Sequence, residues 1–144
     1  MQIKPLTDKH DFHMAYPVMK QLRPHLLDEK QFIEQIQRQQ LQNYVLLAMI
    51  EADDIIGLAG YRIQENLLYG RYLYVDDLVI SESQRSAGYG ARLLRAVMEI
   101  AKHHECDEFV LDTGLSMALA QKFYFRQGLL TQAIRFRNRL SQLV

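Results

Sequence analysis

Apolar residues recur at two different spacings along this chain, and the spacings separate predicted helices from predicted strands. Near the N-terminus, Thr7 or Asp8 can cap a helix with apolar residues every three or four positions, and Pro17 should kink that helix or mark its start. Asp28 opens a second helical segment. The buried sides are predicted to be Phe12, Tyr16, Met19 and Leu22 in the first helix, and Phe32, Ile33 and Ile36 in the second.

The next part of the pattern is typical of β-strands. Tyr44–Glu51 and Ile55–Ile63 are β-rich runs separated by residues 52–54, which is the spacing of a hairpin. A third run, Tyr69–Ile80, follows a polar turn at residues 64–66. Gln2–Leu6 is a candidate short strand at the start of the chain. These runs predict an antiparallel meander.

The periodicity becomes helical again after Ile80. From Gly88 to about His104, apolar positions recur every three or four residues and charged side chains lie opposite them. Phe109–Leu111 is then a short apolar run, typical of a strand buried on both faces. A strand, a helix and a strand joined this closely indicate a right-handed crossover between parallel strands.

The last segments are expected to complete the sheet. Ser116 is predicted to cap a final helix through Gln127, with Gly128 as the residue that ends it, and Leu129–Leu140 alternates as a closing strand would. No linker, repeat or low-complexity tract divides the chain. We therefore expect an α+β fold in a single domain over residues 1–144, with a central mixed, mostly antiparallel sheet, one parallel βαβ crossover and about four flanking helices.

Composition excludes several classes of partner. The chain has 17 basic and 17 acidic residues, so no net field attracts it to nucleic acid or to an anionic membrane. Cys106 is its single cysteine, which excludes an internal disulfide framework. The N-terminus lacks the apolar core of a signal peptide, and no apolar run approaches transmembrane length. We expect a cytoplasmic protein.

The turn between the third predicted β-run and the following helix has the features of a phosphate site. Gly88 and Gly90 allow the backbone to approach a ligand closely, and Arg85 adds a cation. The free N–H groups and the positive dipole end of the helix point into this turn. The phosphate loop of nucleotidases, the nucleophile elbow of hydrolases and the third glycine of a dinucleotide-binding turn are all missing.

Two motifs resemble a known family. The turn Gln84/Arg85-x-x-Gly88-x-Gly90, entered from the strand at residues 72–80, is similar to the acyl-CoA signature of the GNAT superfamily of N-acetyltransferases. The later pattern Ala120-x-x-Phe123-Tyr124-x-x-x-Gly128-Leu129 resembles the helix and turn that follow the fifth strand in that family. One departure is Ser86, which stands where many members carry glycine, so the backbone there is expected to be less free.

The resemblance implies acetyl-CoA as the co-substrate; separately, no metal is expected. Its pantetheine arm would pair with the backbone of one of two splayed parallel strands, and its pyrophosphate would lie on backbone amides at the start of the helix. The residues implied for the first contact are Leu78, Val79 and Ile80. Those implied for the second are Arg85, Ser86, Ala87, Gly88, Tyr89, Gly90 and Ala91.

Direct attack by an amine on the thioester requires a base, an oxyanion donor and an acid. Tyr124 occupies the family's tyrosine position and is the candidate acid for the departing thiolate, with a core or rim aromatic as the alternative. Asp76 aligns with the acidic position that some members use as a base, while Asp77 could be that base or a structural acceptor. The strand pleat predicts one carboxylate on each face. The oxyanion donor is expected to be the backbone N–H of Leu78 or Val79.

The acceptor is less constrained by the sequence. In this fold residues 20–26 and the turn after Ile63 tend to wall the acceptor site, and here they contain Arg23, His25, Tyr61 and Arg62 but no acidic cluster. A small-molecule amine or an amino-acid-like acceptor is the first hypothesis, and a protein N-terminus or lysine is the second. A non-catalytic acyl-CoA-binding sensor or interaction module of the same fold is the alternative function.

Two further clusters are more simply explained by solvent exposure. His103, His104 and Cys106 lie at a predicted helix end without the spacing of a metal site. Arg135, Arg137 and Arg139 alternate as on the outer face of a strand. These arginines could alternatively guide an anionic acceptor or contact the second subunit of a homodimer.

Overall fold

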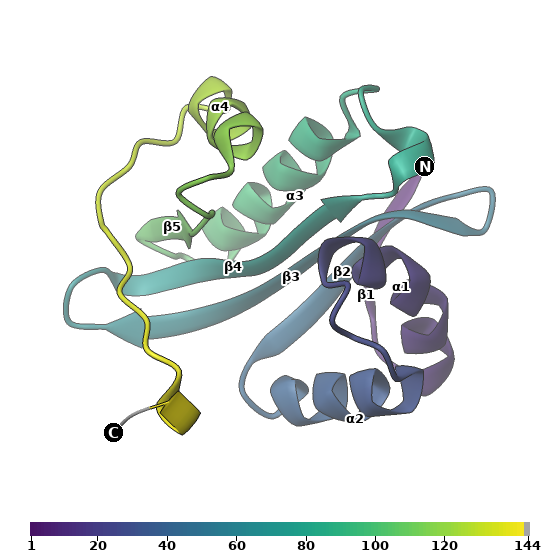
Figure 1. Cartoon of the computed structure of the whole chain (residues 1–144). Coiled ribbons are helices and arrows are strands. Elements are labelled where there is room, and N and C mark those ends of the chain that lie inside the picture. Colours follow the sequence, from purple (N-terminus) through teal and green to yellow (C-terminus); the bar gives the residue numbers. More distant parts are fainter. Residues whose placement is uncertain (143–144) are drawn as a thin grey trace. The chain divides into compact units, whose positions relative to one another are not determined.

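The computed structural model describes residues 1–142, which divide into two compact units, one from Met1 to Leu111 and one from Asp112 onward. The first unit is built on a five-stranded sheet with the order β1-β2-β3-β4-β5 (Figure 1). Its elements are β1 (Gln2–Leu6), α1 (Lys9–Leu22), α2 (Glu29–Gln40), β2 (Tyr44–Glu51), β3 (Asp54–Asn66), β4 (Gly70–Ile80), the 3-10 turn η1 (Glu82–Gln84), α3 (Tyr89–His103) and β5 (Glu108–Leu111).

The sheet is mixed, as the sequence predicts. The pairs β1–β2, β2–β3 and β3–β4 are antiparallel, and β5 lies parallel to β4 after the crossover through α3. With α4 of the second unit, the described part of the chain has four α-helices. The prediction of an α+β fold with one parallel βαβ crossover is confirmed.

Local side-chain contacts explain where the first helices begin. The carboxylates of Asp8 and Asp28 cap α1 and α2 by accepting the backbone N–H groups of Asp11 and Gln31. Pro17 lies within α1 and so does not mark its start. None of the helices in residues 1–142 is long and apolar enough to cross a membrane.

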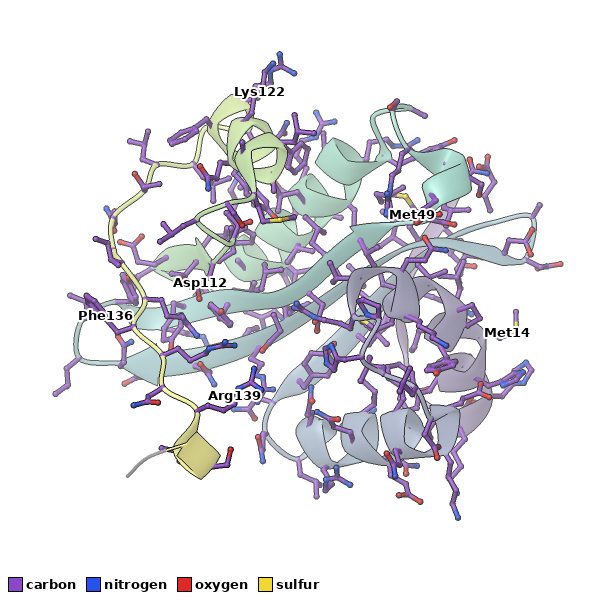
Figure 2. The ribbon with its side chains drawn as sticks, viewed as in Figure 1. Met14, Met49, Asp112, Lys122, Phe136 and Arg139 are labelled. Atoms are coloured by element: carbon purple, nitrogen blue, oxygen red, sulfur yellow. The ribbon has the colours of Figure 1, made fainter. Side chains whose placement is uncertain are left out.

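Two clusters of buried side chains cover the two faces of the sheet, because alternate residues of each strand point to opposite faces. One cluster joins the sheet to α1 and α2, and includes Phe12, Met19, Phe32, Ile36, Leu46, Leu58 and Val79. The other joins the sheet to α3, and includes Leu47, Met49, Leu73, Val75, Leu93 and Val97. Figure 2 shows the contrast between Met49, which is fully buried in the second cluster, and the exposed Met14 of α1.

The second unit contains α4 (Ala118–Arg126) and the 3-10 turn η2 (Leu140–Gln142). Gly128 ends α4 with a φ of 89°, and the N–H groups of Gly128 and Leu129 bond to the carbonyls of Phe125 and Tyr124. This is a Schellman motif, and it confirms the predicted role of Gly128. The predicted cap at Ser116 is wrong, because α4 begins one residue later, after Met117, without a capping side chain.

The strand predicted over Leu129–Leu140 does not form in the described residues. A strand requires a second strand as its hydrogen-bonding partner, and the described part of the second unit offers a helix and a 3-10 turn. Ile134 and Phe136, two of the alternating residues of this run, are exposed; Phe136 is labelled in Figure 2.

Candidate active site

The parallel pair β4–β5 covers only the first half of β4. Pairing with β5 runs from Tyr72 to Val75, whereas pairing with β3 continues along the other edge to Ile80. Residues 76–80 therefore have a strand neighbour on one edge only within the first unit. The predicted pantetheine-pairing residues Leu78, Val79 and Ile80 lie in this one-sided stretch, with Val79 buried and the other two half-buried.

A tight loop follows the one-sided stretch of β4. The Nε of Arg85 donates to the carbonyl of Ile80 at 3.1 Å, so this side chain folds back against the end of the strand. Ser86 has a φ of 70° and Gly88 a φ of 79°, both in the left-handed region. Glycine reaches this region without cost, whereas serine does not. The position where Ser86 replaces the family's usual glycine is thus one at which the backbone conformation favours glycine.

The loop delivers the chain to the N-terminus of α3. Gly88 is the cap residue of this helix and has no side chain to occupy the first N–H groups, which belong to Tyr89, Gly90 and Ala91. Such an end carries unsatisfied donors and the positive pole of the helix dipole. The loop and the helix end have the backbone geometry that the phosphate-site prediction requires, while binding itself stays a prediction.

A β-bulge in β4 changes how the two aspartates point. Gly60 of β3 pairs with Asp77 and the next residue, Tyr61, pairs with Val75, so Asp76 is the additional residue. After a bulge the alternation of faces is shifted. Leu78 accordingly packs in the α3 cluster and Val79 in the cluster of α1 and α2.

The two carboxylates consequently lie on the same face of the sheet. Asp77 bonds to Tyr44 and Asp76 bonds to Arg62, and Tyr44 and Arg62 are directly opposed on β2 and β3. Directly opposed residues of an antiparallel pair share a face. The prediction of one carboxylate on each face is therefore wrong, because it assumed an unbroken pleat.

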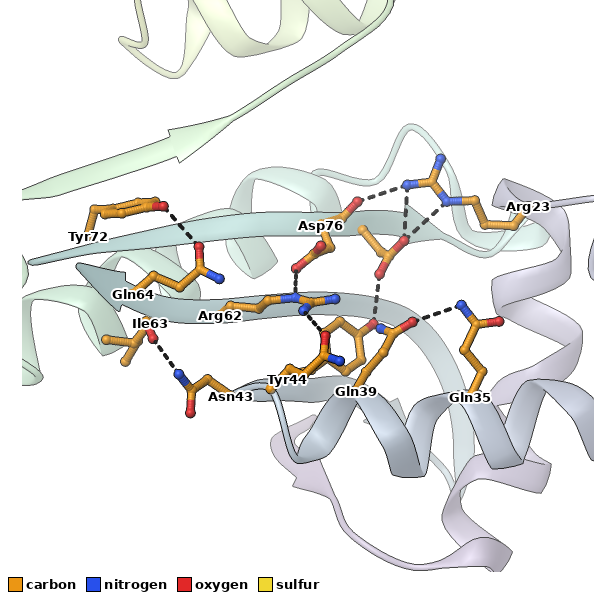
Figure 3. Close-up of polar contacts among 12 residues, drawn as sticks. Arg23, Gln35, Gln39, Asn43, Tyr44, Arg62, Ile63, Gln64, Tyr72 and Asp76 are labelled. Carbon is orange, nitrogen blue, oxygen red and sulfur yellow. Dashed lines mark hydrogen bonds and ion pairs between the residues drawn. The ribbon is translucent and has the colours of Figure 1, made fainter. Parts of the chain in front are cut away.

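Asp77 is held by three hydrogen bonds, whose donor residues, Arg23 and Tyr44, are labelled in Figure 3. Its Oδ1 accepts from Nε and Nη2 of Arg23 at 3.1 and 3.0 Å, and its Oδ2 accepts from the Tyr44 hydroxyl at 2.7 Å. Nη2 of Arg23 also donates to the backbone carbonyl of Asp76 at 2.8 Å. Because Arg23 is the residue that ends α1, it ties the end of that helix to the bulge.

Asp76 has a simpler environment than Asp77. Its Oδ2 accepts from Nε of Arg62 at 3.1 Å, and its Oδ1 has no partner among the described residues. Arg62 is itself held, since its Nη1 donates to Gln42 and its guanidinium lies 5.5 Å from the centre of the Tyr44 ring. Asp76 is thus the carboxylate that can still accept a proton or a hydrogen bond.

Burial governs the protonation of this cluster. It raises the pKa of the Asp76 carboxyl above its usual value of 3.8, and the charge of Asp77 acts in the same direction, while Arg62 opposes both. Burial and, next, the negative charge of Asp77 raise the pKa of the Tyr44 hydroxyl well above its usual value. Tyr44 therefore stays protonated and donates to Asp77, and Asp76 is a stronger base than an ordinary aspartate.

A cavity of about 300 Å³ opens beside Asp77, between the sheet and the first two helices. Its lining residues are Met19, Arg23, His25, Leu26, Phe32, Gln35, Ile36, Gln39, Tyr44 and Asp77. The sequence predicted the segment with Arg23, His25 and Leu26 at the acceptor site, and it lines this cavity. Tyr61 does not, because it is buried in the α3 cluster on the other face of the sheet.

A larger hollow lies at the end of α3, lined by Glu99, Ile100, Lys102, His103 and His104. Its lining combines both signs of charge on the last turns of one helix. It contains neither the two aspartates nor the loop at the start of α3. The two candidate catalytic carboxylates therefore lie at the bulge of β4 and not at this hollow.

Tyr124 lies in α4, in the second unit. Its side chain is half-buried, its ring meets that of Phe123 at 5.3 Å, and burial raises the pKa of its hydroxyl above the usual value of 10.0. It therefore carries its proton at neutral pH.

The sequence offered no direct indication of the role of Tyr44. One indirect signal was Gly60, since a glycine inside a strand often marks a close approach by another group. A Cβ at Gly60 would collide with the Tyr44 hydroxyl and with Oδ2 of Asp77.

Two comparisons with known proteins both identify acetyltransferases as relatives. The profile of the acetyltransferase (GNAT) family matches residues 10–129. The uncharacterized N-acetyltransferase YhdJ of Bacillus subtilis (strain 168) is 30% identical over 140 residues, which cover 96% of this chain and 98% of that protein.

Solved structures share the fold at lower identity. A candidate acetyltransferase from Agrobacterium tumefaciens strain C58 has a TM-score of 0.84 at 20% identity, covering 96% of this chain and 99% of its own. The aminoglycoside N-acetyltransferase AAC(6')-Iy, solved with CoA, has a TM-score of 0.82 at 19% identity, with 96% and 94% covered. It has also been solved with a bisubstrate analog, CoA-S-monomethyl-acetylneamine, at a TM-score of 0.80 and 19% identity, with 96% and 97% covered.

Proposed function

Because the chain belongs to the GNAT acetyltransferase family, we propose that it transfers an acetyl group from acetyl-CoA to a primary amine, by direct attack of the amine while both substrates are bound. The observation that carries this proposal is the one-sided stretch of β4, which runs from the bulge at Asp76 directly into the loop and the N-terminus of α3. The backbone edge of this stretch suits the amide-containing arm of a long ligand, and the helix end that follows it suits a pyrophosphate on the same ligand.

The residues proposed to hold acetyl-CoA follow this series. The backbone of Leu78, Val79 and Ile80 would pair with the pantetheine amides as a strand does. The amides from Ser86 to Ala91 would hold the pyrophosphate, with Arg85 as the nearby cation. Bound in this way, the thioester supplies an activated acetyl group. CoA in the solved complexes of AAC(6')-Iy supports the choice of ligand.

Each proton transfer is assigned to one group of this chain. Asp76 accepts a proton from the amine, in preference to Asp77, whose two oxygens are already engaged by Arg23 and Tyr44. The backbone N–H of Leu78 or Val79 donates to the carbonyl oxygen as negative charge develops on it. Tyr124 gives its proton to the CoA thiolate as the C–S bond breaks.

This assignment requires both compact units, because Tyr124 belongs to the second and Asp76 to the first. We therefore propose that residues 1–144 work as one N-acetyltransferase domain. The acceptor proposed is a small-molecule amine rather than a protein amine. The name of AAC(6')-Iy, an aminoglycoside N-acetyltransferase, supports an acceptor of this kind.

The test combines binding and turnover. Acetyl-CoA at about 100 times its Kd should raise the free energy of unfolding by roughly 2.7 kcal/mol, which a thermal shift detects. A panel of amines should then release free thiol, measured with a chromogenic disulfide. Stabilisation without turnover on any amine would favour the non-catalytic binding module, and no stabilisation would contradict both functions.

Two variants test the assigned roles. Tyr124→Phe and Asp76→Asn should each lower kcat by about 10²–10⁴ while the thermal shift with acetyl-CoA persists. The matched controls are Tyr69→Phe, and Asp53→Asn at a left-handed turn position that asparagine tolerates; both should keep wild-type turnover. Unchanged kcat in either test variant would remove that residue from the mechanism.

A further inference from the structure

We propose that the acceptor is a monoamine with an apolar body, whose body occupies the cavity lined by α2 and whose amine meets Asp76. This inference rests on the proposed function and names the substrate class of the same site. It is carried by the position, the charge and the lining of the cavity.

The cavity lies next to the proposed base. Asp77 and Tyr44 form its wall on the sheet, and Asp76 is the neighbour of Asp77 on the same face because of the bulge. Tyr44 also contacts Arg62, the partner of Asp76. Asp76 lies outside the lining itself, so the amine is placed at the sheet end of the cavity, beside Asp77 and toward the Asp76 carboxylate.

The charge of the lining disfavours a second ammonium group. Asp77 is the single carboxylate among the lining residues, and both of its oxygens are engaged by Arg23 and Tyr44. The other polar lining groups are the guanidinium of Arg23, the imidazole of His25, and the neutral amides of Gln35 and Gln39. An ammonium group placed here would lose hydration without gaining a free anion. Polyamines and aminoglycosides carry several such groups.

The opposite wall is apolar. Met19, Phe32 and Ile36 are core residues with at most 4% of their surface exposed, and Leu26 is half-buried beside them. Burial of roughly 50 Å² of apolar ligand surface against this wall should raise affinity by about tenfold. The cavity volume of about 300 Å³ equals that of roughly ten water molecules, which suits a single ring or a branched alkyl chain.

At one position, a substitution can add a free negative charge to the cavity and so test this argument. Gln39 lines the cavity and accepts a hydrogen bond from Nε2 of Gln35 at 3.0 Å, whereas the adjacent Gln40 is exposed and lies outside the lining. Gln39→Glu adds a carboxylate to the cavity, and Gln40→Glu adds the same charge to the same helix without reaching the cavity.

The experiment measures thiol release from acetyl-CoA by the full chain with four probes: 2-phenylethylamine, isoamylamine, spermidine and neamine. We expect kcat/KM for the two apolar monoamines to exceed that for the two polycations by at least tenfold. Gln39→Glu should raise the ratio of spermidine to 2-phenylethylamine by about tenfold at low salt, and Gln40→Glu should leave that ratio unchanged.

Three outcomes would overturn the inference. These are preference of the wild-type protein for spermidine or neamine, equal ratios in the two glutamate variants, and turnover with none of the four amines. In the first two cases acetyl-CoA turnover persists, so the proposed function stands and only the acceptor class fails. In the third case the inference fails, and the thermal shift with acetyl-CoA together with the wider amine panel decides separately whether the proposed function fails as well.

A measurement on the wild-type protein keeps the inference testable if Gln39→Glu does not fold. 2-Phenylethanol, the neutral analogue of the aromatic monoamine, should inhibit competitively against 2-phenylethylamine, because it fills the cavity without an ammonium group. Absence of competition at concentrations up to its solubility would contradict the assignment of the cavity to the apolar body.

Discussion

Removal of the Asp77 carboxylate should destabilise the protein markedly, although Asp77 is not assigned a proton transfer. Asp77→Ala leaves the hydroxyl of Tyr44, a residue only 3% exposed, without its acceptor. A buried polar group that loses its partner costs about 1–3 kcal/mol. The pair with Arg23 adds about 1 kcal/mol, because the Arg23 side chain is 41% exposed and solvent screens it. We expect a loss of about 3 kcal/mol and a Tm lower by roughly 6–12 °C.

A double-mutant cycle tests the stated cause. Tyr44→Phe alone should cost about 1 kcal/mol, as expected for one hydrogen bond. In the Asp77→Ala background the same change should cost nothing or should stabilise, because it removes the hydroxyl that has lost its acceptor. The measurement is urea unfolding followed by circular dichroism, with Glu34→Ala as the control for removal of an exposed carboxylate. The reasoning would be refuted by a Tyr44→Phe cost that is equal in both backgrounds.

Three further predictions concern the same region. Gly60→Ala should lower the Tm, because the new methyl group would occupy the space of the Tyr44 hydroxyl, and a Tm within 1 °C or so of wild type would contradict the close packing. Ser86→Gly should stabilise by about 1 kcal/mol by relieving the left-handed φ, whereas Ser83→Gly should not. For Asp76, the raised pKa means that the folded state binds its proton more tightly than the unfolded state does. The stability of the wild type relative to Asp76→Asn should therefore fall as pH rises above 3.8 through the raised pKa, and a rise over that range in denaturant titrations would be inconsistent.

The features that sequence predicted correctly are those set by neighbouring residues. The caps at Asp8 and Asp28 depend on side chains bonding to N–H groups three residues away. Gly128 ends α4 through its own left-handed backbone. The helix after Gly88 follows from a periodicity that repeats along a single segment. In each case the residues responsible lie within a few positions of the structure they produce.

The features that sequence missed depend on distant partners. The bulge at Asp76 arises from the register between β3 and β4, which no alternation pattern within β4 reveals. The role of Tyr44 arises because it faces Gly60 and Asp77 from another strand. Likewise, the alternation over residues 129–140 is typical of a strand, but alternation alone supplies no hydrogen-bonding partner.

The bulge in β4 also changes which residues of the strand face each side of the sheet. Upstream of it, Leu73 and Val75 point toward α3; downstream, Leu78 points that way and Val79 points toward α1 and α2. In a strand of the same length without the bulge, simple alternation would turn Leu78 toward α1 and α2 and Val79 toward α3. Loss of one residue at Asp76 would restore simple alternation and leave both side chains on their present faces. The bulge therefore adds one side chain, and with it the second carboxylate, to the face of the sheet that borders the cavity, without moving the apolar residues that follow it.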